Sequence, residues 1–139
     1  DALKYEGDTM GHCVGGYCDD VASGKSKIYS LRDAKGKPHV TIEVRPNPPK
    51  YNTDTIPNQE IPQEGFRVAQ IKGPSNKAPD PSVLPYVQDF VRSGQWSDVR
   101  DLHHTGLMDI RAFPKRVEAL GSPYVTEKEL NGYLDQFGN

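Results

Sequence analysis

Cysteine, tryptophan and long apolar runs are all scarce in this chain. Its 139 residues include 2 Cys, 2 Met and 1 Trp. No apolar run is long enough to cross a bilayer, and no charged-then-apolar signal segment stands at the start, so the sequence predicts no membrane partner. The formal net charge of -2 does not indicate nucleic-acid binding by bulk charge, although it leaves a local basic patch open.

The low hydrophobic content sets the scale of the core. Hydrophobic residues make up 35% of the chain and predict a modest core, while 13 Gly and 12 Pro predict long, turn-rich connections. The length suits one domain, with a motif-bearing helix and sheet over residues 1–80 and a helical part over residues 81–139. Because the chain begins at Asp1 without a methionine, we expect it to be a fragment of a longer protein.

The densest group of reactive side chains lies in residues 10–18, which contain both cysteines and one of the four histidines. Apolar side chains at helical spacing predict a helix over about residues 10–22. Cys13 and Cys18 would point to different faces of this helix and bridge poorly, so we expect reduced thiols. The stretch is therefore the first place to look for chemistry.

Strand patterns follow this helix. Residues 27–32 and 39–45 flank a turn over residues 33–37 and predict an antiparallel hairpin. In the second strand, Val and Ile alternate with polar residues that we expect to share one face, namely His39, Thr41 and Glu43.

A third strand is predicted over residues 66–72, and simple alternation places Val68 and Gln70 on the same face. The proline-rich stretch over residues 46–65 predicts a long extended loop, a feature that is often functional. The second half predicts a helix from Asp80 to about Ser93, a short strand at Tyr124, and a capped helix over residues 126–137. These elements predict an α+β fold, with a small antiparallel sheet of about three to four strands packed by the N-terminal helix and additional C-terminal helices.

Four short pieces of the first 80 residues stand in a recognisable order: residues 10–17, 28–32, 41–43 and 70–73, followed by Asn76. In this order they resemble the PcfJ-like family, whose domains are carried by conjugative plasmids, phages and related mobile elements. The resemblance implies a mobile-element or bacterial-conflict setting, in the bacterial cytoplasm or after delivery into a host or recipient cell. It also implies a shared polar set: His12, Cys13, Tyr17, Arg32, Thr41, Glu43, Gln70 and Asn76.

Cys13 is the strongest candidate for catalysis. A thiol in the first turn of a helix has its thiolate stabilised by unpaired backbone N–H groups and the helix dipole. With His39 as the base and Gln70 as an orienting or oxyanion-binding amide, the order of residues predicts a cysteine-dependent hydrolase or transferase acting on a protein or other acyl substrate. We assign substrate binding in this hypothesis to His12, Tyr17, Arg32, Thr41, Glu43 and Asn76.

Two other interpretations of Cys13 stay open. Most unpaired cysteines are small buried apolar residues, and Cys13 could be one of them. A zinc site is the other interpretation, in which His12, Cys13 and Cys18 combine with His39, His103 or His104. Their spacing only partly matches that of structural zinc sites, so the sequence predicts no metal and no cofactor.

The alternative function is a non-catalytic module that binds nucleic acid or protein. Ten basic residues against five acidic ones lie between residues 25 and 77, with Tyr29, Tyr51 and Phe66 as candidate stacking groups. The bases chosen for contact with nucleic acid are Lys25, Lys27, Lys35, Lys37, Arg45, Arg67 and Lys72.

A polar set on neighbouring strands supports a site of some kind. We expect Arg32, Thr41, Glu43 and Gln70 to converge on one face of the sheet, beside the helix that carries Cys13. A glutamate on a central strand is costly to bury unless it is paired, so Arg32 and Glu43 are predicted to form an ion pair. Structural bracing and ligand binding both remain open for this set.

Overall fold

A computed structural model describes residues 25–138 of the chain. Over this range the chain forms a four-stranded sheet and three α-helices, so the predicted α+β class is confirmed. The helix predicted over about residues 10–22, with Cys13 and Cys18, lies outside the described residues. Within the described range, no helix is both long enough and apolar enough to span a membrane.

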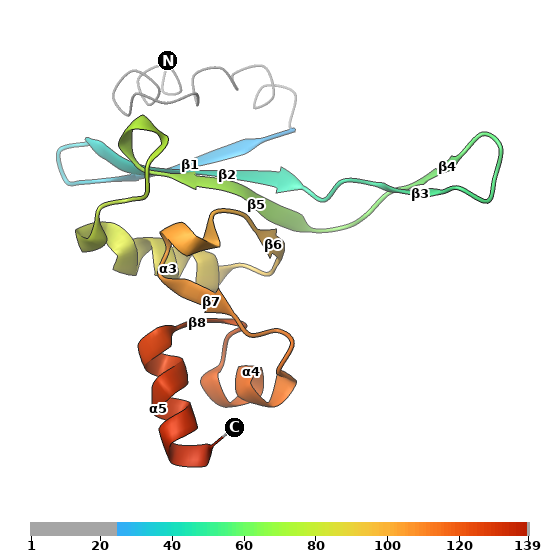
Figure 1. Cartoon of the computed structure of the whole chain (residues 1–139). Helices are drawn as coiled ribbons and strands as arrows, with labels where there is room; N and C mark the ends of the chain where they lie inside the picture. The colour runs from blue at the N-terminus through green and yellow to red at the C-terminus, as the bar shows by residue number, and fades with distance from the viewer. Residues whose placement is uncertain (1–24, 139) are drawn as a thin grey trace.

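The sheet is built on two long central strands (Figure 1). Its order is β1 (Lys27–Arg32), β2 (Pro38–Pro46), β5 (Phe66–Lys72) and β6 (Trp96–Val99). The pairs β1–β2 and β2–β5 are antiparallel, whereas β6 runs parallel to β5. The predicted hairpin and third strand are therefore confirmed, and β6 adds a fourth strand from the second half of the chain.

The turn between β1 and β2 follows from Asp33 and Gly36. The Asp33 carboxylate accepts hydrogen bonds from the backbone N–H groups of Lys35 and Lys37, at 2.9 and 3.0 Å. Gly36 has a φ of 82°, which glycine adopts without the steric cost of a side chain. This local chemistry closes the hairpin where the sequence predicts it.

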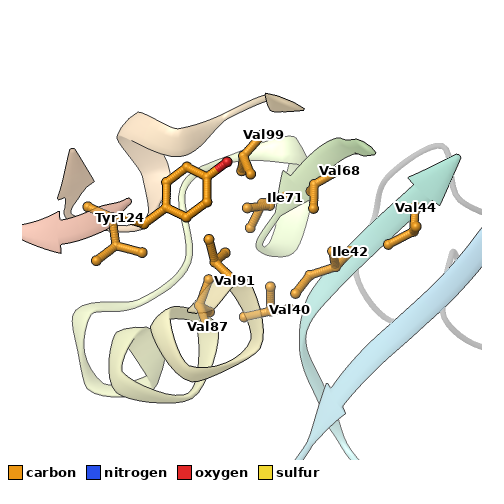
Figure 2. Close-up of a cluster of buried hydrophobic side chains, with 10 residues drawn as sticks. Val40, Ile42, Val44, Val68, Ile71, Val87, Val91, Val99 and Tyr124 are labelled. Atoms are coloured by element: carbon orange, nitrogen blue, oxygen red, sulfur yellow. The ribbon is translucent and has the colours of Figure 1, made fainter. Parts of the chain in front are cut away.

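The core lies between one face of the sheet and α3 (Leu84–Ser93), which packs beneath it in Figure 1. Figure 2 shows side chains from β2, β5 and α3 pointing toward one another. Those with no exposed surface include Val40, Ile42, Val68, Ile71, Val87 and Val91. Burial of each such side chain contributes roughly 1.5–3 kcal/mol, so this apolar layer holds the helix to the sheet.

A β-bulge in the pairing of β2 with β5 changes the faces of the third strand. Glu43 pairs with Gln70, but the next residue of β2, Val44, pairs with Val68, so β5 carries one extra residue. Both Val68 and Ile71 are consequently buried in the core. The prediction that Val68 and Gln70 share a face is wrong, because simple alternation does not survive a bulge.

The stretch predicted as an extended loop is instead a second hairpin. Strands β3 (Lys50–Asn52) and β4 (Gln59–Ile61) pair antiparallel and form an arm, residues 47–65, that extends beyond the sheet (Figure 1). The arm is fastened at its base, where the Asn47 backbone N–H donates to Gly65 O and its side-chain amide donates to Glu64 O. Its prolines lie outside the two short strands, which is why the proline-rich composition still permits pairing.

The C-terminal part is more finely divided than predicted. Short helical turns η2 (Pro74–Asn76), η3 (Pro81–Val83) and η4 (Leu102–His104) punctuate it. The strands β7 (Leu107–Asp109) and β8 (Tyr124–Thr126) pair, with α4 (Pro114–Leu120) between them and α5 (Glu127–Phe137) after them. The predicted capping box is confirmed, since Thr126 Oγ1 accepts from the Glu129 backbone N–H and the Glu129 carboxylate accepts from that of Thr126.

Candidate functional site

The face of the sheet opposite α3 is lined by polar side chains. Val40, Ile42 and Val44 of β2 belong to the core, so Thr41, Glu43 and Arg45 point to the other face. Their cross-strand partners share that face. We call this set the polar face: Ser30 and Arg32 of β1, Thr41, Glu43 and Arg45 of β2, and Arg67, Gln70 and Lys72 of β5. The register places Thr41, Glu43 and Gln70 on one face, as predicted. Arg32 pairs with Pro38 after a bulge in β1, and the hydrogen bond from its Nε to Ser30 Oγ connects it to this face.

Glu43 is the buried carboxylate at the centre of the polar face. Only 3% of the residue is exposed. Ser26 Oγ donates to Glu43 Oε2 at 2.5 Å, and Arg45 Nε donates to the same oxygen at 2.8 Å. Among contacts between described residues, Arg45 thus takes the place predicted for Arg32, whose Nε donates to Ser30 Oγ at 3.0 Å. A strand places residues i and i+2 on one face, so Arg45 is the nearer partner in sequence as well.

Two donor groups on the polar face have no acceptor among the described residues. They are Nε of Arg67 and Nε2 of Gln70, and both atoms are buried. Their backbones pair with Arg45 and Glu43 of β2, respectively. A buried donor without an acceptor costs roughly 1–3 kcal/mol, so such groups point to a partner outside the described residues.

Arg67 also lines a cleft at the base of the arm, which we call the arm-base cleft. Its volume is about 650 Å³. The lining residues are Asn47, Pro48, Pro49, Lys50, Gln63, Arg67, Ser97, Asp98 and Arg100. Three of these are basic and only Asp98 is acidic, so the cleft favours anions. Arg100 was not chosen from the sequence, because it lies 28 residues after Lys72 and reaches the cleft only through the parallel pairing of β6 with β5.

His39 lies in a different cleft, at the turn end of the sheet. This cleft has a volume of about 700 Å³ and is lined by Ser30, Leu31, Arg32, Asp33, Ala34, His39, Ser82, Val83 and Tyr86. His39 Nε2 is 3.1 Å from Asp33 Oδ2. The hydrogen bond from His39, followed by those from the Lys37 and Lys35 backbones, lowers the pKa of the Asp33 carboxyl below its ordinary value. The turn therefore supplies His39 with an ionised carboxylate partner.

The structure does not bring His39 and Gln70 together. Gln70 pairs with Glu43, which lies four residues after His39 on β2, a separation of about 13 Å along the strand. Asn76 is exposed in η2, beyond the end of β5. His12, Cys13 and Tyr17 lie outside the described residues.

The basic residues chosen for nucleic acid fall into separate groups. Arg45, Arg67 and Lys72 lie on the polar face. Lys35 and Lys37 lie in the turn, and Lys25 and Lys27 lie at or just before the start of β1. Among these groups, only Arg67 lines the arm-base cleft, where Lys50 and Arg100 join it.

The described histidines of the zinc hypothesis lie in two different places. His103 and His104 lie in η4, and His104 Nδ1 is 2.8 Å from the backbone oxygen of Ile71. His39 lies in the cleft with Asp33. His12, Cys13 and Cys18 fall outside the described residues.

Replacing Glu43 with alanine tests its place in the polar face. Glu43→Ala removes the acceptor that Ser26 and Arg45 share, and we expect the free energy of unfolding to fall by about 2–3 kcal/mol. Urea denaturation measures this loss. The matched control, Glu60→Ala, removes an exposed carboxylate of β4 and should change stability by less than about 0.5 kcal/mol. Equal effects of the two substitutions would contradict the buried role of Glu43.

Comparison with known proteins gives one family match. The family described as PcfJ-like protein matches residues 1–56, which are 56 of the 139 residues. That range contains Cys13, His39 and Glu43 but ends before Gln70. Neither the curated proteins nor the solved structures contain a match. Over its N-terminal part, the chain is thus similar to PcfJ-like proteins.

Proposed function

We propose that the protein binds single-stranded nucleic acid at the arm-base cleft. The observation that carries this proposal is the buried Nε of Arg67, which has no acceptor among the described residues and lines a cleft together with Lys50 and Arg100. A phosphate oxygen is an acceptor with the charge that three basic side chains favour. The chain as a whole carries a net charge of -2, so the attraction is local to this cleft.

Two exposed aromatic residues, each next in sequence to a basic residue of the cleft, support a single strand over a duplex as the ligand. Tyr51 follows Lys50 on β3 and is 57% exposed, and Phe66 precedes Arg67 on β5 and is 42% exposed. Unpaired bases stack on such rings, at about 1–3 kcal/mol per base, whereas the bases of a duplex are already stacked. Basic groups that hold the backbone and rings that hold the bases are the two parts of a single-strand site.

The charge of the arm limits where the strand lies. Asp54, Glu60 and Glu64 are exposed along the arm, and Lys50 at its base is its one basic residue. Phosphates are repelled by the outer arm and attracted to its base. We therefore place the strand across the cleft, between Lys50 and Arg100, and not along the arm.

Removing the two exposed bases of the cleft tests this proposal. We expect Lys50→Ala and Arg100→Ala each to weaken binding of a fluorescent oligo(dT), and each to reduce the slope of log affinity against log salt by about 0.7. Fluorescence anisotropy between 50 and 200 mM salt measures both effects. The matched control is Lys128→Ala, which removes one exposed positive charge from α5, away from the cleft.

The control variant and a duplex of the same length separate binding at this cleft from weak general attraction. The control should bind oligo(dT) like the unchanged protein, and a duplex of the same length should bind less tightly than the single strand. Equal losses for Lys128→Ala and Arg100→Ala would contradict a site at the cleft. No salt-dependent binding at all would contradict the proposal as a whole.

We propose as a second candidate that Cys13 is the nucleophile of an acyl hydrolase or transferase. The specific observation in its favour is His39, whose ring is 3.1 Å from the Asp33 carboxylate in a cleft of about 700 Å³. This pair supplies a base and the group that orients it, with Asp33 in the role first given to Gln70. In the proposed reaction, His39 accepts the thiol proton, the thiolate attacks the acyl carbonyl, and the leaving group departs with that proton. Water or an acceptor then takes the acyl group from sulfur.

Thiol reactivity tests this second candidate. In a Cys18→Ser background, we expect Cys13 to react with iodoacetamide at neutral pH at least about tenfold faster than a model thiol, because a paired base raises the thiolate fraction. His39→Ala should remove most of this increase in the reaction rate of Cys13, and the control His103→Ala should leave the rate unchanged. A rate equal to that of the model thiol, or one that is insensitive to His39→Ala, would contradict the role of His39.

The family match supports a proposal about setting. We propose that the protein belongs to a conjugative plasmid, phage or related mobile element and acts in the bacterial cytoplasm or in a host or recipient cell. The match of residues 1–56 to PcfJ-like proteins supports this setting.

A further inference from the structure

We infer that Asp101, His103 and His104 form a binding site for a zinc-type divalent metal ion. Each of these residues offers one ligand atom, and the three atoms lie within 4.8 Å of one another. A tetrahedral zinc ion with bonds of about 2.1 Å holds its ligand atoms roughly 3.4 Å apart. To bind such an ion, the three ligand atoms must move closer together than the observed spacing. The site is separate from the arm-base cleft and does not depend on the proposed function.

The backbone of β5 orients two of the ligands. Asp101 Oδ2 accepts from the Ile71 backbone N–H at 3.0 Å, and His104 Nδ1 lies 2.8 Å from the Ile71 backbone oxygen. A carbonyl oxygen only accepts hydrogen bonds, so Nδ1 of His104 carries the proton. The neutral ring then presents the lone pair of Nε2. A histidine whose second nitrogen donates to a backbone carbonyl is the usual arrangement behind a metal ligand.

The conformation of Asp101 also indicates a constrained position. Its φ of 60° and ψ of 25° are left-handed, a region that non-glycine residues adopt infrequently. This conformation begins η4 directly after Asp101, so that the two histidines follow within three residues of the carboxylate. The hydrogen bonds to Ile71 anchor Asp101 and His104 to the same residue of β5 before a metal ion binds.

The third ligand leaves the site open to solvent. His103 is exposed, and its ring centroid lies 4.3 Å from that of His104. Two imidazole nitrogens and one carboxylate oxygen are a donor set that suits zinc. With three protein ligands, the fourth position of a tetrahedral ion is free for water or an exchangeable ligand.

Lys72 competes with the metal ion for Asp101. Its ammonium nitrogen is 3.3 Å from Asp101 Oδ2, so a bound cation must displace it or share the carboxylate with it. Replacing Lys72 with methionine keeps the length of the side chain and removes the charge. If Asp101 is a metal ligand, Lys72→Met should bind Zn²⁺ more tightly than the unchanged protein. Loss of a general structural contact would instead weaken Zn²⁺ binding.

Isothermal titration with Zn²⁺ tests this inference in the full chain. A Cys13→Ser, Cys18→Ser background removes the thiols, which bind zinc themselves. We expect one Zn²⁺ per chain, a loss of affinity of at least about tenfold in His103→Ala, and a gain in Lys72→Met. His103 is exposed, so its replacement leaves the fold intact, and circular dichroism checks this. The matched control His39→Ala, outside the site, should leave affinity unchanged.

A second measurement reports on His104 without changing it. In ¹H–¹⁵N spectra of the histidine rings, saturating Zn²⁺ should shift the Nε2 signal of His104 while Nδ1 keeps its proton. Zinc affinity that His103→Ala leaves unchanged would overturn the inference. So would a spectrum in which the signals of His39 shift and those of His103 and His104 do not.

Discussion

Burial of β2 on both faces is the constraint on which the rest of the structure depends. Val40 and Ile42 face α3, while Thr41 and Glu43 face the other way, and the whole run from Val40 to Val44 is almost completely buried. A carboxylate in such a strand has to be satisfied locally, and Ser26 and Arg45 do so for Glu43. The pairing partners of β2 are thereby fixed, since a slip of one residue would exchange its apolar and polar faces.

Elements whose signals are local could be predicted from the sequence. Alternation along β2, the Asp33–Gly36 turn and the capping box at Thr126 all follow from neighbouring residues, and all are found in the structure. The bulge in β5 and strand β6 could not be predicted in this way. A bulge depends on which residues of two strands meet, and β6 is a strand only because it lies beside β5. The arm was mistaken for a loop because its two strands are only three residues long.

The candidate sites also combine features that local sequence signals predict with contacts that only the fold creates. Strand alternation places Thr41, Glu43 and Gln70 on a common face once it is known which residues of β2 and β5 pair. That Arg45 is the partner of Glu43 depends instead on how far the arginine side chain extends. Arg100 joins Lys50 and Arg67 through the sheet, and Asp101 joins His104 through the backbone of Ile71. These contacts connect residues about 30 or more positions apart, and no spacing in the sequence marks them. Basic composition located a positive region but not the cleft.

A buried guanidinium nitrogen with no acceptor within residues 25–138 connects the fold to the proposed function. Arg67 Nε is held on a strand that the bulge and the core keep in place, beside two exposed bases. The most direct measurement is therefore the ¹H–¹⁵N signal of this Nε–H group during titration with oligo(dT). We expect it to move downfield and saturate as the strand binds, because a charged phosphate oxygen becomes its acceptor. An Arg67 signal that stays unchanged while oligo(dT) is fully bound would contradict the proposal that this cleft holds the strand.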